Sequence, residues 1–175
     1  SFCVLRKKFL CTVALSIISV GNISTAGNLS LYSFTEGAAD EGMPNLTSGD
    51  ENVAIGDEAL KANTSGSNNT AIGDEALKSN TSGSDNTAIG KNSLYTNTSG
   101  SKNVAIGVEA LKFNRTGTNN VAIGFEALQR NTTGQKNVAI GAQSGYSNTT
   151  GVQNTSVGHE ALEANTTGYR NTALG

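Results

Sequence analysis

The sequence predicts an all-β fold, a parallel β-solenoid of about seven coils, from three observations. The motif Asn-Val/Thr-Ala-Ile-Gly at residues 52–56 returns every 17 residues until the chain stops. Each unit then carries a turn signal of the type Asn-Thr-Ser/Thr-Gly, as at residues 63–66. The 175 residues include 21 Gly, one Pro, no Trp and five Phe, too few large side chains for a compact core. Self-similarity at a fixed period is the signature of a repeat architecture.

Residues 1–26 predict a secretory signal peptide. Arg6, Lys7 and Lys8 precede a mostly apolar run over residues 9–20, and small residues end the segment. This order is typical of an export signal. The apolar run is too short to span a bilayer as a permanent helix. The competing interpretation is a buried core helix.

Residues 27–45 show no period and are interpreted as a leader or N-terminal cap. They mix Gly, acidic residues and isolated apolar residues. Residues 46–49 are in register with residues 63–66, so the solenoid is expected over residues 46–175. The chain opens with Ser1 and closes five residues into a repeat. We therefore expect a piece of a longer protein, truncated at its C-terminus.

The first half of each unit predicts a short strand. In Val53-Ala54-Ile55 the two larger side chains point to one face and the Ala side chain points to the other. The position of Ile55 never carries a polar residue, so this apolar column is expected to be buried, either in the core or at an interface between chains. Which of the two faces points into the coil stays open. The column comprises Ile55, Ile72, Ile89, Ile106, Ile123, Ile140, Val157 and Leu174.

The second half of each unit predicts a second short strand beginning with Ala59-Leu60, followed by the return turn. The competing interpretation is a short helix at residues 57–62, whose residues are good helix formers but too few to be stable alone. The apolar column of the second strand comprises Leu60, Leu77, Leu94, Leu111, Leu128 and Leu162. At the return turn we expect Asn to bond through its side chain and Gly to take a positive φ. These turn glycines are Gly66, Gly83, Gly100, Gly117, Gly134, Gly151 and Gly168.

The need to cover apolar surface predicts an oligomer. A coil this thin can hardly bury both strand faces inside itself, so one apolar column must meet another chain or another domain. The carboxylates at the position of Glu58 would stack at like charge from coil to coil, which predicts that their face is exposed and solvated.

Composition argues against catalysis, metal binding and nucleic-acid binding. The net charge is -2 and no basic face is expected. Both cysteines, Cys3 and Cys11, lie in the first segment, which leaves no disulfide framework and no thiolate metal site. His159, the only histidine, occupies a variable repeat position, and no nucleophile, base and orienting group recur together. We expect no enzyme, no cofactor and no specific metal.

Two further features bear on contacts and modification. The turn asparagines at the position of Asn63 all fall in N-glycosylation sequons, although turn chemistry is the favoured explanation for them. Exposed aromatic residues are enriched at interfaces, so the aromatic residues of the repeats are candidate adhesive contacts, with the covering of neighbouring coils as an equal alternative. They are Tyr95, Phe113, Phe125, Tyr146 and Tyr169.

The recurring Asn-Val/Thr-Ala-Ile-Gly motif behind an export signal resembles the YadA-like head repeats of trimeric autotransporter adhesins. The resemblance covers residues 46–175. It implies a left-handed parallel β-roll with the motif as its inner strand, three chains about one axis, and a head displayed beyond a coiled-coil stalk and an outer-membrane anchor. The unit of 17 residues is longer than the family's usual repeat. It looks like a long-coil variant, of the kind also found in tail-fibre-like surface proteins.

The resemblance implies a non-enzymatic adhesin head that mediates cell or matrix adhesion as a homotrimer. Its partner would be a host-matrix or cell-surface ligand. The head would be secreted and displayed at the cell surface, on the outer membrane of a Gram-negative bacterium, with membrane attachment only through an anchor outside this sequence. The alternative is a structural repeat spacer of a phage tail-fibre-like protein, against which the export signal argues.

Overall fold

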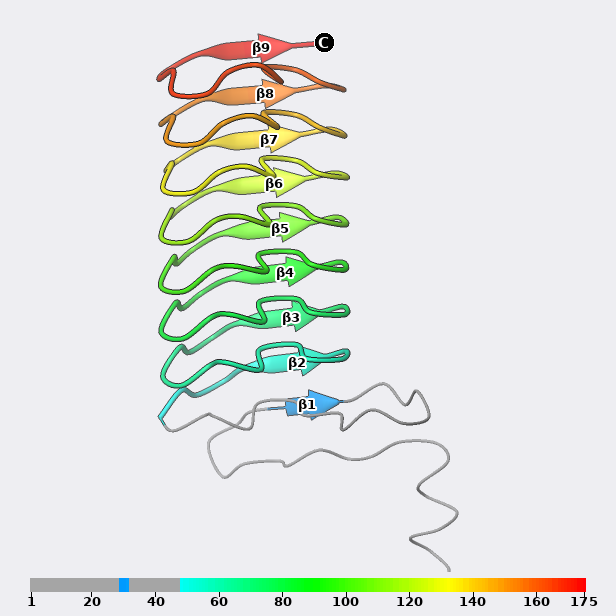
Figure 1. The fold of residues 1–175 in the computed structure, drawn as a ribbon, viewed down its shortest axis with the longest axis vertical. Coiled ribbons are helices and arrows are strands. Elements are labelled where there is room, and N and C mark those ends of the chain that lie inside the picture. The colour runs from blue at the N-terminus through cyan, green and yellow to red at the C-terminus, as the bar shows by residue number, and fades with distance from the viewer. Residues whose placement is uncertain (1–28, 32–47) are drawn as a thin grey trace, which may run out of the picture.

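Nine parallel strands of three residues form one continuous sheet in the computed structural model, which describes residues 29–31 and 48–175 (Figure 1). Sheet order follows chain order, so each strand pairs with its copies one coil earlier and one coil later. The predicted signal peptide and most of the predicted leader lie outside the described residues. The strands are β1 (Leu29–Leu31), β2 (Val53–Ile55), β3 (Thr70–Ile72), β4 (Thr87–Ile89), β5 (Val104–Ile106), β6 (Val121–Ile123), β7 (Val138–Ile140), β8 (Thr155–Val157) and β9 (Thr172–Leu174).

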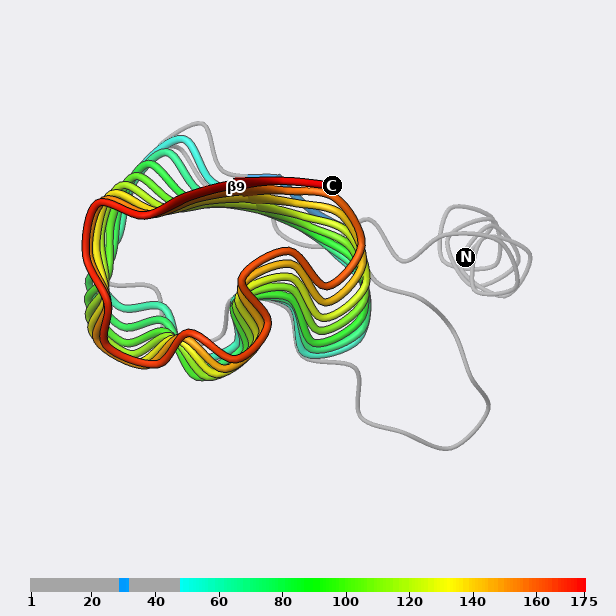
Figure 2. The ribbon, with the colours of Figure 1, turned by 90° about the horizontal axis from the view of Figure 1, so that it is seen from above.

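The register of the sheet follows the sequence repeat. Ala54 lies opposite Ala71, and Ile55 lies opposite Ile72. β1 extends the sheet beyond β2, a strand that the sequence analysis did not predict within the leader. Seen with the C-terminal end toward the viewer, the chain runs clockwise around each coil, so the solenoid is left-handed (Figure 2). The predicted all-β solenoid of about seven coils is confirmed.

The second half of each coil is a run of turns, so the predicted second strand is wrong. The N–H of Ala59 donates to the carbonyl of Gly56 at 3.3 Å, a three-residue turn bond. The N–H of Lys61 donates in the same way to the carbonyl of Glu58 at 3.2 Å. Glu58 and Leu60 have φ of 52° and 54°, in the left-handed region that neither strand nor helix uses. The alternative helix is wrong too, since the described part of the chain contains no helix.

The leucines of this turn segment fill the interior of the solenoid. Leu60, Leu77, Leu94, Leu111 and Leu128 are buried and left-handed, and Leu162 is half-buried. A left-handed conformation costs a non-glycine residue about 1–2 kcal/mol. Full burial of a leucine side chain stabilises by about 1.5–3 kcal/mol, which offsets that cost. Facing the leucines are the buried alanines of the strands: Ala54, Ala71, Ala88, Ala105, Ala122 and Ala139.

One coil departs from this core. Gly145 stands where the other coils have Leu, and Ser144 and Ser156 replace two inward alanines. The Ser144 hydroxyl lies 2.7 Å from the Ser156 hydroxyl and 3.0 Å from the Ser156 carbonyl, so the two buried hydroxyls are satisfied within the core. Because both polar groups have partners, the replacement is tolerated.

Truncating Leu111 to Ala is expected to lower the free energy of unfolding by about 2–4 kcal/mol, because it opens a cavity at a fully buried position. The control is Val108→Ala in the same coil, at a side chain that is 43% exposed, where a loss under about 0.5 kcal/mol is expected. Denaturant unfolding followed by circular dichroism measures both. Equal losses for the two variants would contradict the assignment of Leu111 to the core.

Candidate functional site

The outer face of the sheet is apolar and uncovered in the single chain. We call the outward-pointing first and third residues of β2 to β9 the outer sheet face; they are Val or Thr, and Ile, Val or Leu. In β2 these residues are half-buried on either side of the buried Ala54. Ile140 is 38% exposed and Leu174 is 76% exposed. The predicted Ile column therefore lies outside the solenoid's own core and is the candidate interface.

The first Asn of each repeat belongs to a buried ladder that sequence reasoning missed. The Nδ2 of Asn86 donates to the carbonyl of Gly100 at 2.9 Å and to the Oδ1 of Asn69 at 3.1 Å. Its Oδ1 accepts from the N–H and from the Nδ2 of Asn103, both at 3.1 Å. Each amide thus uses all its hydrogen-bonding capacity, as a buried polar group must. The recurrence of Asn in every copy was the available signal.

The turn asparagines form a second buried ladder. The Nδ2 of Asn63 donates to the carbonyl of Gly66 at 2.9 Å, and the N–H of Gly66 donates to the Oδ1 of Asn63 at 3.2 Å. The Nδ2 of Asn80 then donates to the same Oδ1 at 2.9 Å. Asn63 and Asn80 are fully buried. The predicted side-chain bonding of the turn Asn is therefore confirmed, and turn chemistry accounts for the Asn at this position.

The turn glycines are required for close approach and not, as predicted, for a positive φ. A Cβ on Gly66 would lie 2.2 Å from the carbonyl oxygen of Gly83 and 2.6 Å from the Oδ1 of Asn63. Left-handed glycines instead follow the strands: Gly56 has a φ of 129°, and a Cβ there would lie 2.6 Å from the carbonyl of Gly73. Only glycine lets the backbones of neighbouring coils meet at these two corners.

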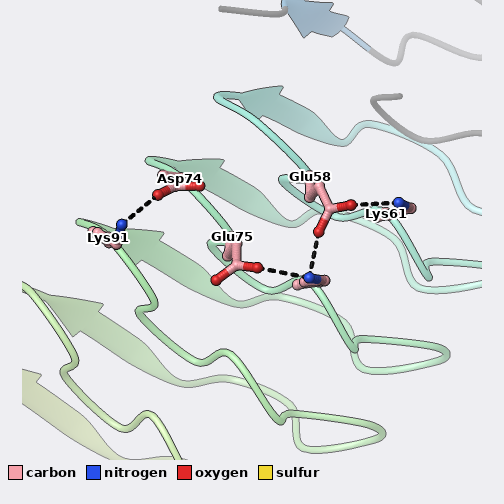
Figure 3. A network of polar contacts seen from close by, with 6 residues as sticks. Glu58, Lys61, Asp74, Glu75 and Lys91 are labelled. Carbon is pink, nitrogen blue, oxygen red and sulfur yellow. Dashed lines mark hydrogen bonds and ion pairs between the residues drawn. The ribbon is translucent and has the colours of Figure 1, made fainter. Parts of the chain in front are cut away.

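The sequence predicted an exposed, solvated face for the stacked glutamates, but only Glu160 is exposed. The glutamates of the earlier coils are half-buried, and Glu58, Glu75 and Glu109 are paired with lysines. Glu58 forms ion pairs with Lys61 in its own coil and with Lys78 in the next, and Lys78 also lies 2.6 Å from Glu75 (Figure 3). Lys61 lies three residues after Glu58, and Lys78 lies between Glu58 and Glu75. The lysines therefore separate the like charges of successive coils. The hydrogen bonds from Lys61 and Lys78 lower the pKa of Glu58 from its ordinary value of 4.5. The bonds to Glu58 and Glu75 raise the pKa of Lys78.

The candidate adhesive aromatics do not form one cluster. Phe113, Phe125 and Tyr169 are exposed, and Phe125 follows the end of β6. Tyr95 and Tyr146 are half-buried, with the Lys78 amine 5.5 Å from the first ring centroid and the Arg130 guanidinium 5.1 Å from the second. The half-buried tyrosines therefore cover neighbouring coils, and the exposed side chains remain candidates for contacts.

The described residues hold no group of His, Cys, Asp and Glu side chains arranged for a metal ion. His159 is exposed, with its Nε2 3.7 Å from a carboxylate oxygen of Glu160. Within residues 29–31 and 48–175 no helix is long and apolar enough to span a membrane.

Comparisons of the chain with protein families, with curated proteins and with solved structures found no match. The geometry offers two things for function: an uncovered apolar face that runs the length of the sheet, and a set of outer positions that vary from coil to coil.

Replacing Asn103 by Ala is expected to lower the free energy of unfolding by about 2–5 kcal/mol, because several buried partners of the amide lose their hydrogen bonds at once. The matched control is Asn119→Lys, at an exposed, left-handed position that Lys102 and Lys136 occupy in other coils. Thermal unfolding compares the two variants. A control as unstable as Asn103→Ala would contradict a specific role for the ladder.

The Glu58 pairs predict a loss of stability in acid. Because the folded pKa of Glu58 lies below the unfolded value, its stabilisation is complete above the unfolded pKa and is lost as the pH falls through the folded one. Glu58→Gln introduces the residue found at the equivalent position 143. It is expected to lower the free energy of unfolding by about 0.5–1 kcal/mol at neutral pH and to flatten the acid limb, the fall of that free energy as the pH is lowered. Asp57→Ala removes a carboxylate that forms no ion pair in the described part of the chain, and should leave the limb unchanged. Denaturant unfolding from neutral to acid pH tests this; an unaltered limb in Glu58→Gln contradicts it.

Proposed function

We propose that this chain is the head of a non-enzymatic, surface-exposed adhesin that mediates cell or matrix adhesion as a homotrimeric fibre. The observation that carries the proposal is the outer sheet face. It repeats an outward pair of side chains, Val or Thr followed by Ile, Val or Leu, from β2 to β9. A contiguous apolar surface of this kind marks an interaction site on a soluble protein.

A closed homo-oligomer is the simplest way to cover this face. Copies of one chain arranged about an axis parallel to the solenoid can each turn the same face inward, which buries every coil's Val/Thr and Ile pair at once. The short strands favour a small ring, since each face is only three residues wide. A trimer satisfies this geometry and matches the family that the motif resembles.

The buried asparagine ladders suit the solenoid to be displayed as a rod at a surface. Both asparagine ladders tie successive coils together through buried amides, which makes the solenoid a rod. Seven coils rise about 34 Å at one inter-strand spacing each. We place this rod at the cell surface, secreted and held on the outer membrane of a Gram-negative bacterium, where its variable outer positions meet a host-matrix or cell-surface ligand. Neither a cofactor nor a catalytic group takes part.

A structural spacer of a tail-fibre-like protein is the second candidate. It is favoured by the near-identity of the coils that carry β2 and β3, whose inward and ion-paired positions are the same. Such a spacer would also be trimeric, but its repeats would bind no surface.

The purified chain is expected to have three times the monomer mass by light scattering after size exclusion, with a β-rich circular dichroism spectrum. Ile106→Asp combined with Ile123→Asp places charges in the outer sheet face and should yield a folded monomer, because neither side chain belongs to the solenoid core. Phe125→Ala, at a position that is Ala142 in the next coil, is the control and should remain trimeric.

A stable, β-rich monomer of the unmodified chain would refute the trimer. Attachment to immobilised matrix proteins and to cells separates the two candidates: a trimer that attaches supports the adhesin head, and a trimer that attaches to neither supports the spacer.

A further inference from the structure

In the C-terminal half of the solenoid, charge is segregated between the two ends of the coil. We call the return turns of the C-terminal half the basic edge; its segments are residues 97–102, 114–119, 131–136, 148–153 and 165–170. These five turns contain no carboxylate and four basic residues: Lys102, Arg115, Lys136 and Arg170. The carboxylates of the same coils, such as Glu109 and Glu126, lie after the strands, at the other end. A basic strip therefore exists on a chain whose net charge is -2.

The four cations of the basic edge are exposed and unpaired. None of them forms an ion pair within the part of the chain that the structure describes, and Arg170 makes only a 3.2 Å hydrogen bond to the amide oxygen of Gln153. The lysines at the other end behave differently, since Lys78, Lys91 and Lys112 each lie within 2.8 Å or less of a carboxylate. Among the described lysines and arginines, the four cations of the basic edge and Arg130 form no ion pair, and Arg130 lies over the ring of Tyr146.

The solenoid spaces these cations regularly. Lys102, Lys136 and Arg170 occupy the same repeat position, each two residues before a strand, and so form a column along the edge where the strands begin (Figure 1). Successive members are two coils apart, about 9–10 Å at the inter-strand spacing. Arg115 lies in the turn between the first two. Lys102, Lys136 and Arg170 have φ values of 55–59°, so the backbone has the same conformation at all three.

Hydroxyl groups and one aromatic ring share this edge. Each turn adds an exposed Ser or Thr directly before its glycine: Ser99, Thr116, Thr133, Thr150 and Thr167. Tyr169 lies next to Arg170 and is 71% exposed. Cations, hydroxyl donors and a ring that can stack on a sugar face are the groups that a protein uses to hold an acidic polysaccharide.

We propose that the basic edge binds a linear acidic polysaccharide along the solenoid axis. The inference rests on the proposed adhesin function and names the chemical class of its ligand. The interval between cations is close to the length of one disaccharide, and every disaccharide of an acidic polysaccharide carries at least one charge. Nucleic acid fits less well, because its phosphates recur about every 1.7 Å in a duplex and the edge offers one cation per coil at most. The sulfate or carboxylate of the polymer pairs with the column while its hydroxyls meet the Ser and Thr row.

Surface plasmon resonance of the chain purified without the predicted signal peptide, residues 1–26, tests the proposal on heparin, on polygalacturonate and on neutral dextran. We expect salt-sensitive binding to heparin, to polygalacturonate or to both, and none to dextran. Binding to heparin alone identifies sulfate as the recognised group, and binding to polygalacturonate shows that carboxylate suffices. The variant Lys102→Asn/Lys136→Asn/Arg170→Asn should bind about tenfold more weakly or worse, since three charge-assisted contacts are lost. Asn already occupies this left-handed position at Asn68 and Asn119, so the fold is retained.

The matched control removes three cations elsewhere, as Lys91→Ala/Lys112→Gln/Arg130→Ala, each replaced by a residue that another coil carries at that position. Its affinity should stay within about twofold, because these cations lie outside the basic edge. Equal weakening of both variants, or no binding to either acidic polymer at low salt, overturns the proposal. A trimer that adheres to cells yet binds neither polymer overturns this inference alone, whereas a monomer that binds them overturns the trimer alone.

Discussion

The hydrogen bond from one coil to the next sets the rise of the whole solenoid. Backbone groups bond at the inter-strand spacing even where no strand exists, as when the N–H of Leu60 donates to the carbonyl of Ala76 at 3.0 Å. Every side chain must then stack on its counterpart at the same short spacing. Inside the coil, the side chains that tolerate this are those that bond to their own copies, such as Asn, those that are small, such as Ala, and those that pack against their own copies, such as Leu. Outside, like charges need an intervening donor, as Lys78 provides between Glu58 and Glu75.

This constraint explains which features of the fold could be predicted from the sequence. The period, the strand at Val53–Ile55 and the side-chain bonding of the turn Asn all follow from repetition and local chemistry. The turn segment could not be read in the same way. Residues 57–62 have helical propensity, but coil-to-coil bonding overrides it and forces Leu60 into a left-handed conformation that leucine seldom adopts. Local preference carries little weight where tertiary hydrogen bonds fix the backbone.

The sequence predicted which residues form the candidate interface, but not whether they point into or out of the coil. The sequence shows that Ile never gives way to a polar residue, yet the direction of that column depends on what fills the interior. Two asparagine ladders and the leucines already occupy the coil, leaving room only for Ala on the inward side of the strand. The ladders themselves were the missing information. The charge segregation was hidden for a related reason, since it is visible only when residues 17 apart are placed side by side.

The fixed spacing between coils restricts the inward positions of the repeat more than the outer ones. Inward positions are almost invariant from coil to coil, because each must stack on its neighbour, whereas positions such as those of Lys102 and Phe125 vary freely. Groups at these outer positions are held at multiples of one backbone spacing before any ligand arrives. Binding a polymer then orders side chains of the protein but not its backbone, which lowers the entropic cost of association. Each further coil also adds a contact to a chain already held, so affinity for a periodic ligand grows through effective concentration even where single contacts are weak.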